Sequence, residues 1–330
     1  MNSFNYESAT SFSDAIQKKD SPDNRFLAGG TTLIDLMKCG VEHPGKLVNI
    51  LDIPVSHSVT FLKETIHIDA LAHMADLENH PDCQQFAPAI YGSLWQAASP
   101  QIRNMATIGG NLRQRTRCVY FRDPGSNAPC NKRTPGTGCA ALEGLNRNHA
   151  ILGGSDQCVA VYPGDLAVAL TAFDARVHLL SSAGSTRKVS INAFYLLPDK
   201  TPHLEHDIRT DEIITAVEVD RIPALQHSHY LKIRDRSSYE FAATSVAAGI
   251  EVRRGVIGDV RIALGGVGTK PWRAYEVETA LKGKPFNKEN LTTAANLITA
   301  NARPLKDNGF KVTLAPKAIV RALLIAGGQS

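Results

Sequence analysis

Hydrophobic and polar positions change their period repeatedly along the first 100 residues, which is typical of a mixed α/β protein. Residues 84–98 carry apolar side chains at helical spacing, whereas residues 25–28 and 47–50 are apolar runs of strand length. Residues 61–62 and 66–69 indicate a hairpin. We therefore expect helices at residues 12–19, 32–38, 75–78 and 84–98, and strands at residues 25–28, 47–50, 61–62 and 66–69.

The pattern lapses between residues 113 and 163, which are rich in Gly, Pro, Asn and Arg. So long an irregular stretch is unusual inside a compact domain, and a metal site would explain how it stays ordered. Regular patterning then resumes. It predicts a helix at residues 165–173 and strands at 176–180, 188–191 and 212–220.

Pro223 and the polar residues that follow it predict a boundary between two domains. We place the first domain at residues 1–225, with residues 113–163 as an insert, and the second at residues 226–330. The second domain is expected to hold three antiparallel strands followed by helices. The strands are expected at residues 230–233, 244–252 and 260–267, and the helices at 274–281, 290–302 and 316–325.

Composition excludes few further classes of protein. The 330 residues are 43% hydrophobic and 21% charged, as in ordinary globular proteins, and the net charge of +4 is too mild to indicate nucleic-acid binding. Charged residues interrupt the longest apolar runs, so we expect no membrane insertion. The N-terminus lacks the features of a secretory signal. We therefore expect a cytoplasmic chain, or one exported as the passenger of a partner.

Four of the six cysteines lie within 41 residues, with the spacing C-x11-C-x8-C-x18-C: Cys118, Cys130, Cys139 and Cys158. Four thiolates can hold zinc or an iron–sulfur cluster. Structural zinc sites usually contain a short C-x2-4-C interval, which is absent here, so the spacing favours a cluster. Zinc remains the alternative at this point. The other two cysteines, Cys39 and Cys83, are expected to be ordinary thiols.

Cations surround the cysteine segment. Residues 103–147 carry eight Lys and Arg side chains against two acidic ones. Nearby cations stabilise the reduced form of an anionic cluster and raise its reduction potential. A basic zinc loop that binds an acidic surface or RNA would show the same charge pattern. The cations are Arg103, Arg113, Arg115, Arg117, Arg122, Lys132, Arg133 and Arg147.

Two diglycine turns are candidate phosphate-binding segments. Gly29 and Gly30 lie between a predicted strand and a predicted helix, and Gly109 and Gly110 follow an apolar run that resembles a strand. Neither matches G-x-G-x-x-G. Alone, the first favours a plain strand–helix turn without a ligand, and the second is compatible with a β-bulge or a bend. Together they are able to hold one pyrophosphate.

Two charged residues are further candidates for binding a cofactor. Asp165 opens a predicted helix, where it is either a plain N-cap or a ligand of cofactor hydroxyls. Lys232 lies on a predicted strand and, by itself, is expected to be solvated. No G-x-S-x-G, H-E-x-x-H or acid–base pair appears, so the sequence indicates no hydrolase site.

The order of these motifs resembles the FAD-binding medium subunit of the xanthine oxidase family of molybdenum hydroxylases. The resemblance covers essentially the whole chain. It rests on residues 28–33, 107–111, 163–167, 264–267 and 271–273. The cysteine insert is similar to the FAD subunit of bacterial three-subunit aldehyde oxidoreductases, which carries a [4Fe-4S] cluster. The flavin subunit of hydroxybenzoyl-CoA reductase, whose cysteine intervals differ, is the nearer alternative.

The resemblance implies an α+β fold: a two-part FAD-binding domain of the vanillyl-alcohol-oxidase type, then a small C-terminal α/β domain with a three-stranded antiparallel sheet. It implies that Cys118, Cys130, Cys139 and Cys158 hold the [4Fe-4S] cluster. Gly164 stands where many relatives have Ser, so one hydrogen bond to the cofactor is expected to be missing. The FAD contacts that the resemblance implies are Arg25, Phe26, Leu27, Ala28, Gly29, Gly30, Thr31, Thr32, Leu33, Thr107, Gly110, Asn111, Asp165, Ile214 and Lys232.

The implied function is electron transfer in a heterotrimer. A large partner would oxidise an aldehyde to a carboxylic acid at a molybdenum cofactor. A small partner with [2Fe-2S] clusters would pass the electrons to this FAD, which delivers them to an acceptor. No catalytic residue is expected in this chain. Complexes of this branch are often periplasmic, with the export signal on the small subunit. A zinc-clipped binding module and a free-standing flavin oxidase are the competing classes.

Overall fold

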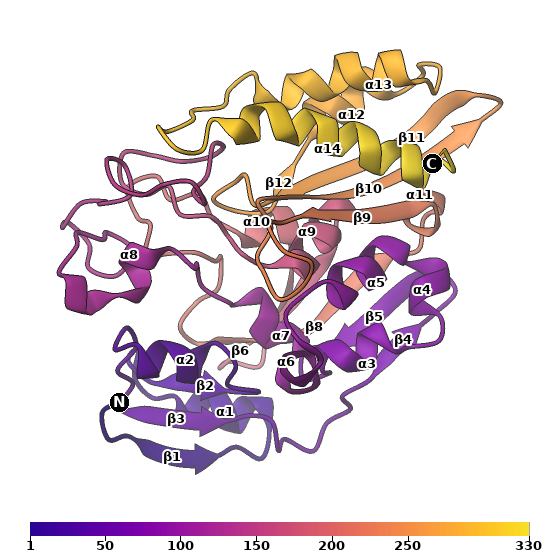
Figure 1. Cartoon of the computed structure of the whole chain (residues 1–330). Helices are drawn as coiled ribbons and strands as arrows, with labels where there is room; N and C mark the ends of the chain where they lie inside the picture. Colours follow the sequence, from indigo (N-terminus) through magenta and orange to yellow (C-terminus); the bar gives the residue numbers. More distant parts are fainter. Residues whose placement is uncertain (330) are drawn as a thin grey trace.

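The computed structural model describes residues 1–329 and contains three separate sheets (Figure 1). The N-terminal sheet is parallel, with the order β1-β3-β2. Ala15 and Ile16 of helix α1 and Val48 of the central strand form its small core. Its elements are β1 (Asn5–Ser8), α1 (Phe12–Lys18), β2 (Arg25–Leu27), α2 (Leu33–Lys38) and β3 (Lys46–Asn49).

The second sheet is antiparallel, with five strands in the order β4-β5-β8-β6-β7. Strand β8 is its central strand, between β5 and β6. Alternation of buried and half-exposed positions along β6 shows that one face of the sheet packs on the core. The strands are β4 (Val59–Phe61), β5 (Thr65–Asp69), β6 (Arg176–Ser181), β7 (Thr186–Ser190) and β8 (Glu212–Asp220).

Short helices surround this sheet, and α9 (Asp165–Ala172) is the most deeply placed of them because all eight of its residues are buried. Its sequence is almost wholly apolar, as expected of a helix that contacts protein on every side. The other helices are α3 (Met74–Glu78), α4 (Cys83–Phe86), α5 (Pro88–Trp95), α6 (Pro100–Met105), α7 (Ile108–Leu112), α10 (Ile191–Phe194) and α11 (Pro223–Gln226).

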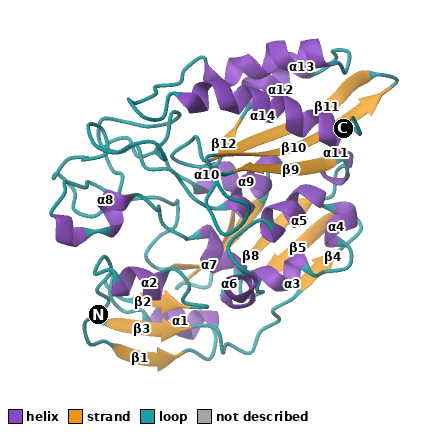
Figure 2. Cartoon of the chain, viewed as in Figure 1, coloured by secondary structure: helices purple, strands orange, loops and turns teal. Residues whose placement is uncertain are grey.

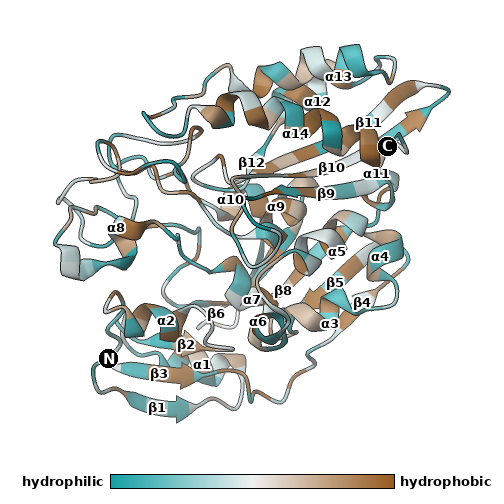
Figure 3. Cartoon of the chain, in the orientation of Figure 1, coloured by the Kyte–Doolittle hydropathy of each residue, from teal (hydrophilic) through white to brown (hydrophobic). Residues whose placement is uncertain are grey.

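The C-terminal sheet is antiparallel, and the three strands expected from the sequence are confirmed. A two-residue strand adds a fourth at one edge, giving the order β12-β11-β10-β9. Helices cover this sheet, and in Figure 3 the outer helix α13 is largely white and teal while β11 carries brown stretches. The elements are β9 (Ser228–Ile233), β10 (Thr244–Arg253), β11 (Val256–Gly265), β12 (Trp272–Arg273), α12 (Tyr275–Leu281), α13 (Lys288–Ala295), the 3-10 helix at Asn296–Thr299 and α14 (Phe310–Ala326).

The insert at residues 113–163 is irregular, as expected. Its regular elements are α8 (Val119–Arg122) and a 3-10 turn at Pro124–Ser126, and Figure 2 shows the rest as loops. In Figure 1 these loops lie at the left, between the N-terminal sheet and the C-terminal helices. Among residues 1–329, no helix combines the length and apolar character needed to cross a bilayer.

Three expectations about helices were wrong in detail. The helix expected at residues 84–98 is two helices, because Ala87, which precedes Pro88, has φ −144° and ψ 57° and leaves the helical region. The second diglycine turn is the helix α7 rather than a bend. Helix α14 begins at Phe310 and contains Pro316 in its interior, whereas we expected it to begin at that proline.

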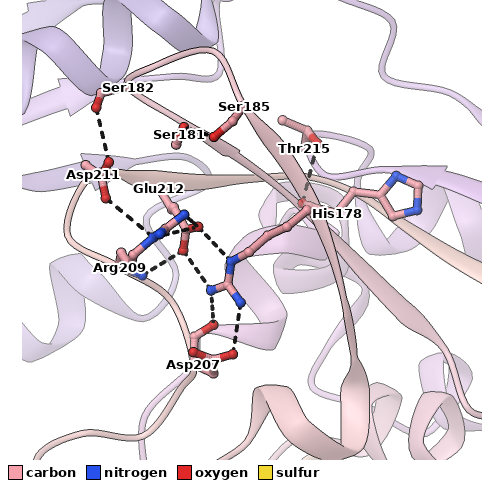
Figure 4. Close-up of polar contacts among 10 residues, drawn as sticks. His178, Ser181, Ser182, Ser185, Asp207, Arg209, Asp211, Glu212 and Thr215 are labelled. Carbon is pink, nitrogen blue, oxygen red and sulfur yellow. Dashed lines mark hydrogen bonds and ion pairs between the residues drawn. The ribbon is translucent and has the colours of Figure 1, made fainter.

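A buried carboxylate anchors the five-stranded sheet. The side chain of Glu212 is 1% exposed and lies between Arg187 and Arg209, and Figure 4 shows it beside Arg209 and Asp207. Arg187 Nε lies 2.7 Å from Glu212 Oε1. Hydrogen bonds from Arg187 are the main cause that lowers the pKa of Glu212 to about 2, so this carboxylate stays ionised.

Candidate functional site

The first diglycine turn connects β2 to α2. Gly30 has φ +70°, a conformation that glycine adopts without strain. A methyl group on Gly29 would lie 1.7 Å from the backbone oxygen of Met105, so no other residue fits there. Met105 ends α6 just before the second turn. The first turn is therefore in direct backbone contact with the end of α6, next to the second turn.

The second turn is built by Thr107. Its hydroxyl accepts a hydrogen bond from the N–H of Gly110 at 3.2 Å and caps α7. Gly109 packs against Ala70, and a methyl group on this glycine would lie 3.0 Å from the Ala70 side chain. Asn111 follows, and its Oδ1 is buried with no hydrogen-bond partner among residues 1–329. A buried amide oxygen of this kind indicates a missing donor.

Asp165 and Lys232 form a buried ion pair, with Lys232 Nζ 2.8 Å from Asp165 Oδ2. The hydroxyl of Tyr230 donates to the other carboxylate oxygen at 2.7 Å. Burial raises the pKa of Asp165, and Lys232 opposes that rise. Plain N-capping is wrong for Asp165, because no side chain caps α9. A solvated Lys232 is also wrong, because its side chain is 1% exposed.

Gly164 is required by its neighbours. A methyl group there would lie 2.6 Å from the ring of Tyr162 and 2.8 Å from Nε2 of Gln114. A serine would therefore displace both side chains. Gln114 in turn donates to the backbone oxygen of Asn111, at the end of α7, at 3.1 Å.

The remaining candidates lie around these turns. Ile214 is a buried residue of β8 and belongs to the same core cluster as Ile108 and Leu112 of α7. The hydroxyl of Thr32 makes no capping bond at the start of α2. Residues 25–33 are all half-buried: Arg25, Phe26, Leu27, Ala28, Gly29, Gly30, Thr31, Thr32 and Leu33.

One further cation lies beside these turns and was not among the residues expected to bind a cofactor. The side chain of Arg113 is exposed and makes no hydrogen bond or ion pair within residues 1–329. Arg25 and Arg115 lie near Arg113, and each of them is paired with a carboxylate. A guanidinium without such a partner favours an anion. The sequence signal was present, because Arg113 follows the second turn directly.

All four clustered cysteines line one cavity, whose empty volume is about 270 Å³ including its opening to solvent. Each comes from a different segment of the insert. Asn131 holds three of these segments together: its Nδ2 donates to the oxygen of Gln157 at 3.1 Å, and its Oδ1 accepts from the N–H of Gly138 at 2.8 Å. These partners directly precede Cys158 and Cys139, and Cys130 directly precedes Asn131. The converging loops are thus positioned by the protein's own hydrogen bonds.

The cysteine sulfurs lie among hydrogen-bond donors. The N–H of Ala160 lies 3.4 Å from Cys158 Sγ. A hydrogen bond from the thiol of Cys158 lowers the pKa of Cys139 and raises that of Cys158. Burial raises the pKa of Cys118 to about 11. Within residues 1–329, no three His, Cys, Asp or Glu side chains come together as ligands of a single metal ion. A metal centre at these cysteines therefore stays a prediction.

Two family models together match nearly the whole chain. The FAD binding domain in molybdopterin dehydrogenase matches residues 2–223, and the CO dehydrogenase flavoprotein C-terminal domain matches residues 229–326. The chain belongs to the FAD-binding medium subunits of the molybdenum hydroxylase family. In this family the molybdenum chemistry takes place on another chain.

Relatives of this FAD-binding subunit include the aldehyde oxidoreductase FAD-binding subunit PaoB of Escherichia coli (strain K12), with 39% identity and full coverage of both chains. The glyceraldehyde dehydrogenase medium chain of Sulfolobus acidocaldarius is 28% identical and covers 92% of this chain and 90% of its own. Carbon monoxide dehydrogenase of Hydrogenophaga pseudoflava has the same fold, with a TM-score of 0.77, 24% identity and coverage of 99% of this chain and 98% of its own.

The residues at the two turns fit the FAD of the family. Gly29 lets the first turn lie directly against the backbone at the end of α6, and Asn111 offers a buried amide oxygen without a partner in residues 1–329. Arg113 supplies a free guanidinium, a group that binds phosphates strongly. This FAD-binding subunit is therefore expected to bind the pyrophosphate where its turns meet.

A chain of ion pairs connects the β2 segment of this FAD-binding subunit to the cysteine cavity. Arg25 pairs with Glu42 at 3.0 Å, and Glu42 pairs with Arg115 at 2.9 Å. Glu205 then joins Arg115 at 2.6 Å to Lys132 at 2.9 Å. Lys132 lines the cysteine cavity. No sequence motif indicated these partners, because Arg115 is 73 residues from Glu42 and 90 residues from Glu205 along the chain.

Proposed function

We propose that this chain is the FAD and [4Fe-4S] electron-transfer subunit of a molybdenum-containing aldehyde oxidoreductase. The observation that carries the proposal is that Cys118, Cys130, Cys139 and Cys158 line one cavity, which a chain of ion pairs connects to the β2 segment. The name of the relative PaoB, an aldehyde oxidoreductase subunit, supports the substrate class.

The FAD contacts that we propose are those expected from the sequence, with Arg113 added. Residues 25–33 would wrap the pyrophosphate, while Thr107, Gly110 and Asn111 would contact the phosphates and the flavin end. Lys232 and Asp165 form one unit, because each neutralises the other in a buried position. Asp165 would accept from the cofactor hydroxyls, and Lys232 would lie near the isoalloxazine ring. Ile214 would exclude water from the flavin pocket.

The cysteine cavity fits a cluster for three reasons. Four sulfurs line it, a backbone N–H lies within 3.4 Å of one of them, and Lys132 borders it. N–H groups and cations near the sulfurs stabilise the added negative charge of reduction. Bound FAD supplies one- and two-electron redox chemistry, and a [4Fe-4S] cluster supplies one-electron chemistry.

We propose a heterotrimer with a small [2Fe-2S] subunit and a large molybdenum-cofactor subunit. Within it, residues 1–225 would form the FAD-binding domain and residues 226–330 the C-terminal domain. Electrons from the aldehyde would pass from molybdenum through the [2Fe-2S] clusters to the FAD of this chain and on to an acceptor. The complex would be periplasmic if the small subunit carries an export signal, and cytoplasmic otherwise.

The full chain purified anaerobically tests this proposal. We expect flavin absorption bands with a broad iron–sulfur shoulder, four irons per chain for a [4Fe-4S] cluster, and no aldehyde turnover by this chain alone. Cys130→Ser should lose the iron. Cys39→Ser is the matched control, because Cys39 does not line the cavity, and it should keep the iron. Zinc in place of iron, or full iron in Cys130→Ser, would contradict the cluster. Absence of flavin would contradict the FAD site independently.

A further inference from the structure

His149 directs a ring nitrogen at the sulfur of Cys118, with Nε2 3.2 Å from Sγ. The residue is 5% exposed, and its ring lies beside that of Tyr120, with the ring centroids 6.4 Å apart. None of the sequence motifs or FAD contacts involves His149. The contact joins a residue late in the insert to the first of the four cysteines.

The state of the sulfur sets the direction of this hydrogen bond. A thiolate that ligates a metal has no proton to donate, so an unprotonated Nε2 facing it would be a buried acceptor without a donor, which is costly. A proton on Nε2 points at the sulfur, and a thiolate accepts it. The geometry thus favours the tautomer in which the Nε2–H donates to Cys118.

The C-terminal domain holds His149 in place through fully buried side chains. Lys311 of α14 is 0% exposed, and its Nζ donates to the backbone oxygen of His149 at 2.9 Å and to that of Gly266 at 2.6 Å. Asn308, also 0% exposed, donates to the same His149 oxygen at 3.2 Å. Buried nitrogen donors need their acceptors, so these bonds hold the backbone of His149 in place.

We propose that His149 donates a hydrogen bond to the Cys118 thiolate that ligates the cluster, and that this bond raises the reduction potential of the cluster. The inference rests on the proposed [4Fe-4S] function of the insert. A hydrogen bond to a ligand sulfur withdraws electron density from it and stabilises the more negative, reduced state. His149 is therefore a positioning residue that acts through Cys118.

Potentiometric titration of the anaerobically purified full chain, followed by electron paramagnetic resonance, tests the proposal. His149→Leu removes the donor, while His149→Gln retains an amide N–H. We expect full iron content in both, a downward shift of the cluster midpoint potential in His149→Leu, and a smaller shift in His149→Gln. His178→Leu is the control, because His178 is also partly buried but touches no cysteine, and it should leave the potential unchanged.

A second measurement decides the question if His149→Leu loses iron. Pulsed paramagnetic resonance of the reduced wild-type chain, labelled with ¹⁵N-histidine, should show a nitrogen coupling that is absent in His149→Gln. An unchanged potential in iron-replete His149→Leu, or no histidine coupling in the wild type, would overturn the role of His149. Wild-type protein without iron would instead overturn the proposed function itself.

Discussion

Glu205 is the carboxylate on which the connection between the two proposed cofactor sites depends, and Glu205→Gln removes its charge while keeping its shape. Its two oxygens lie 2.6 Å from Arg115 Nε and 2.9 Å from Lys132 Nζ. Burial alone would raise the pKa of Glu205. Arg115, Lys132 and His206 outweigh burial and lower this pKa from 4.5 to about 2. The carboxylate is therefore stabilised in the folded chain.

The size of the effect follows from this pKa. One pKa unit corresponds to about 1.4 kcal/mol, so a fall from 4.5 to about 2 corresponds to about 3 kcal/mol of folding free energy. Because the folded pKa lies below the unfolded one, this contribution is complete above pH 4.5 and is lost as the pH falls towards 2. Glu205→Gln should therefore be about 3 kcal/mol less stable at pH 7, and the difference should shrink below pH 4.5.

Glu212→Gln is the matched control. The pKa of Glu212 also lies at about 2, and its side chain pairs with Arg187 and Arg209 in the five-stranded sheet (Figure 4). We expect a similar loss of stability but no effect on the cofactors. In Glu205→Gln, by contrast, both Arg115 and Lys132 lose their shared anion. This variant should bind FAD more weakly and contain less iron than the control.

Urea unfolding of the full chain at pH 7 and at pH 3.5 measures the stability of both variants. Flavin retention on dialysis and iron content measure whether Glu205 connects the two proposed cofactor sites. A stability loss below about 0.5 kcal/mol in Glu205→Gln, or one that does not change with pH, would refute the electrostatic reasoning. Equal flavin and iron contents in the two variants would refute the idea that Glu205 connects the two sites.

Three further predictions concern the proposed FAD site. Gly29→Ala forces a methyl group against a backbone oxygen, so thermal unfolding should show a loss of stability of about 1–3 kcal/mol. Gly309→Ala is the control. No atom lies within 4 Å of its new methyl group, so its stability should change little. Lys232→Met leaves Asp165 buried and unpaired; denaturant unfolding should show a loss of about 3–5 kcal/mol, and adding Asp165→Asn should restore part of it. Arg113→Leu removes the unpaired cation; FAD titration should show affinity about 10- to 100-fold weaker with unchanged thermal stability.

Hydrophobic periodicity predicted most helices and strands, because buried and exposed positions follow a simple pattern along each of them. Strand β6 alternates buried and half-exposed residues, and α9 is apolar throughout, so both follow from the sequence. Helix α7 was missed because two of its five residues are glycines, which are poor helix formers. Thr107 was the available signal, since it is a good N-cap three residues before the N–H that it binds.

The candidate site, like the fold, could be predicted from the sequence only in part. Local motifs predicted the two diglycine turns and the cysteines, but not which partners bring them together. The pairing of Asp165 with Lys232 spans 67 residues, and that of Arg115 with Glu205 spans 90. No local rule relates residues so far apart, because their contact depends on the packing of whole sheets. Sequence patterns therefore identified separate chemical groups, and only the fold joined them.

The long insert is ordered by more than its cysteines. Lys132 attaches it to Glu205, and Lys311 of the C-terminal domain attaches it at His149. Both lysines are buried, and a buried charge keeps its partners only in one geometry because any displacement leaves it unsatisfied. From the sequence, we expected a metal centre to keep this stretch ordered. The structure supplies anchors of its own, so the cysteine loops are held in place by contacts to Glu205 and to the C-terminal domain.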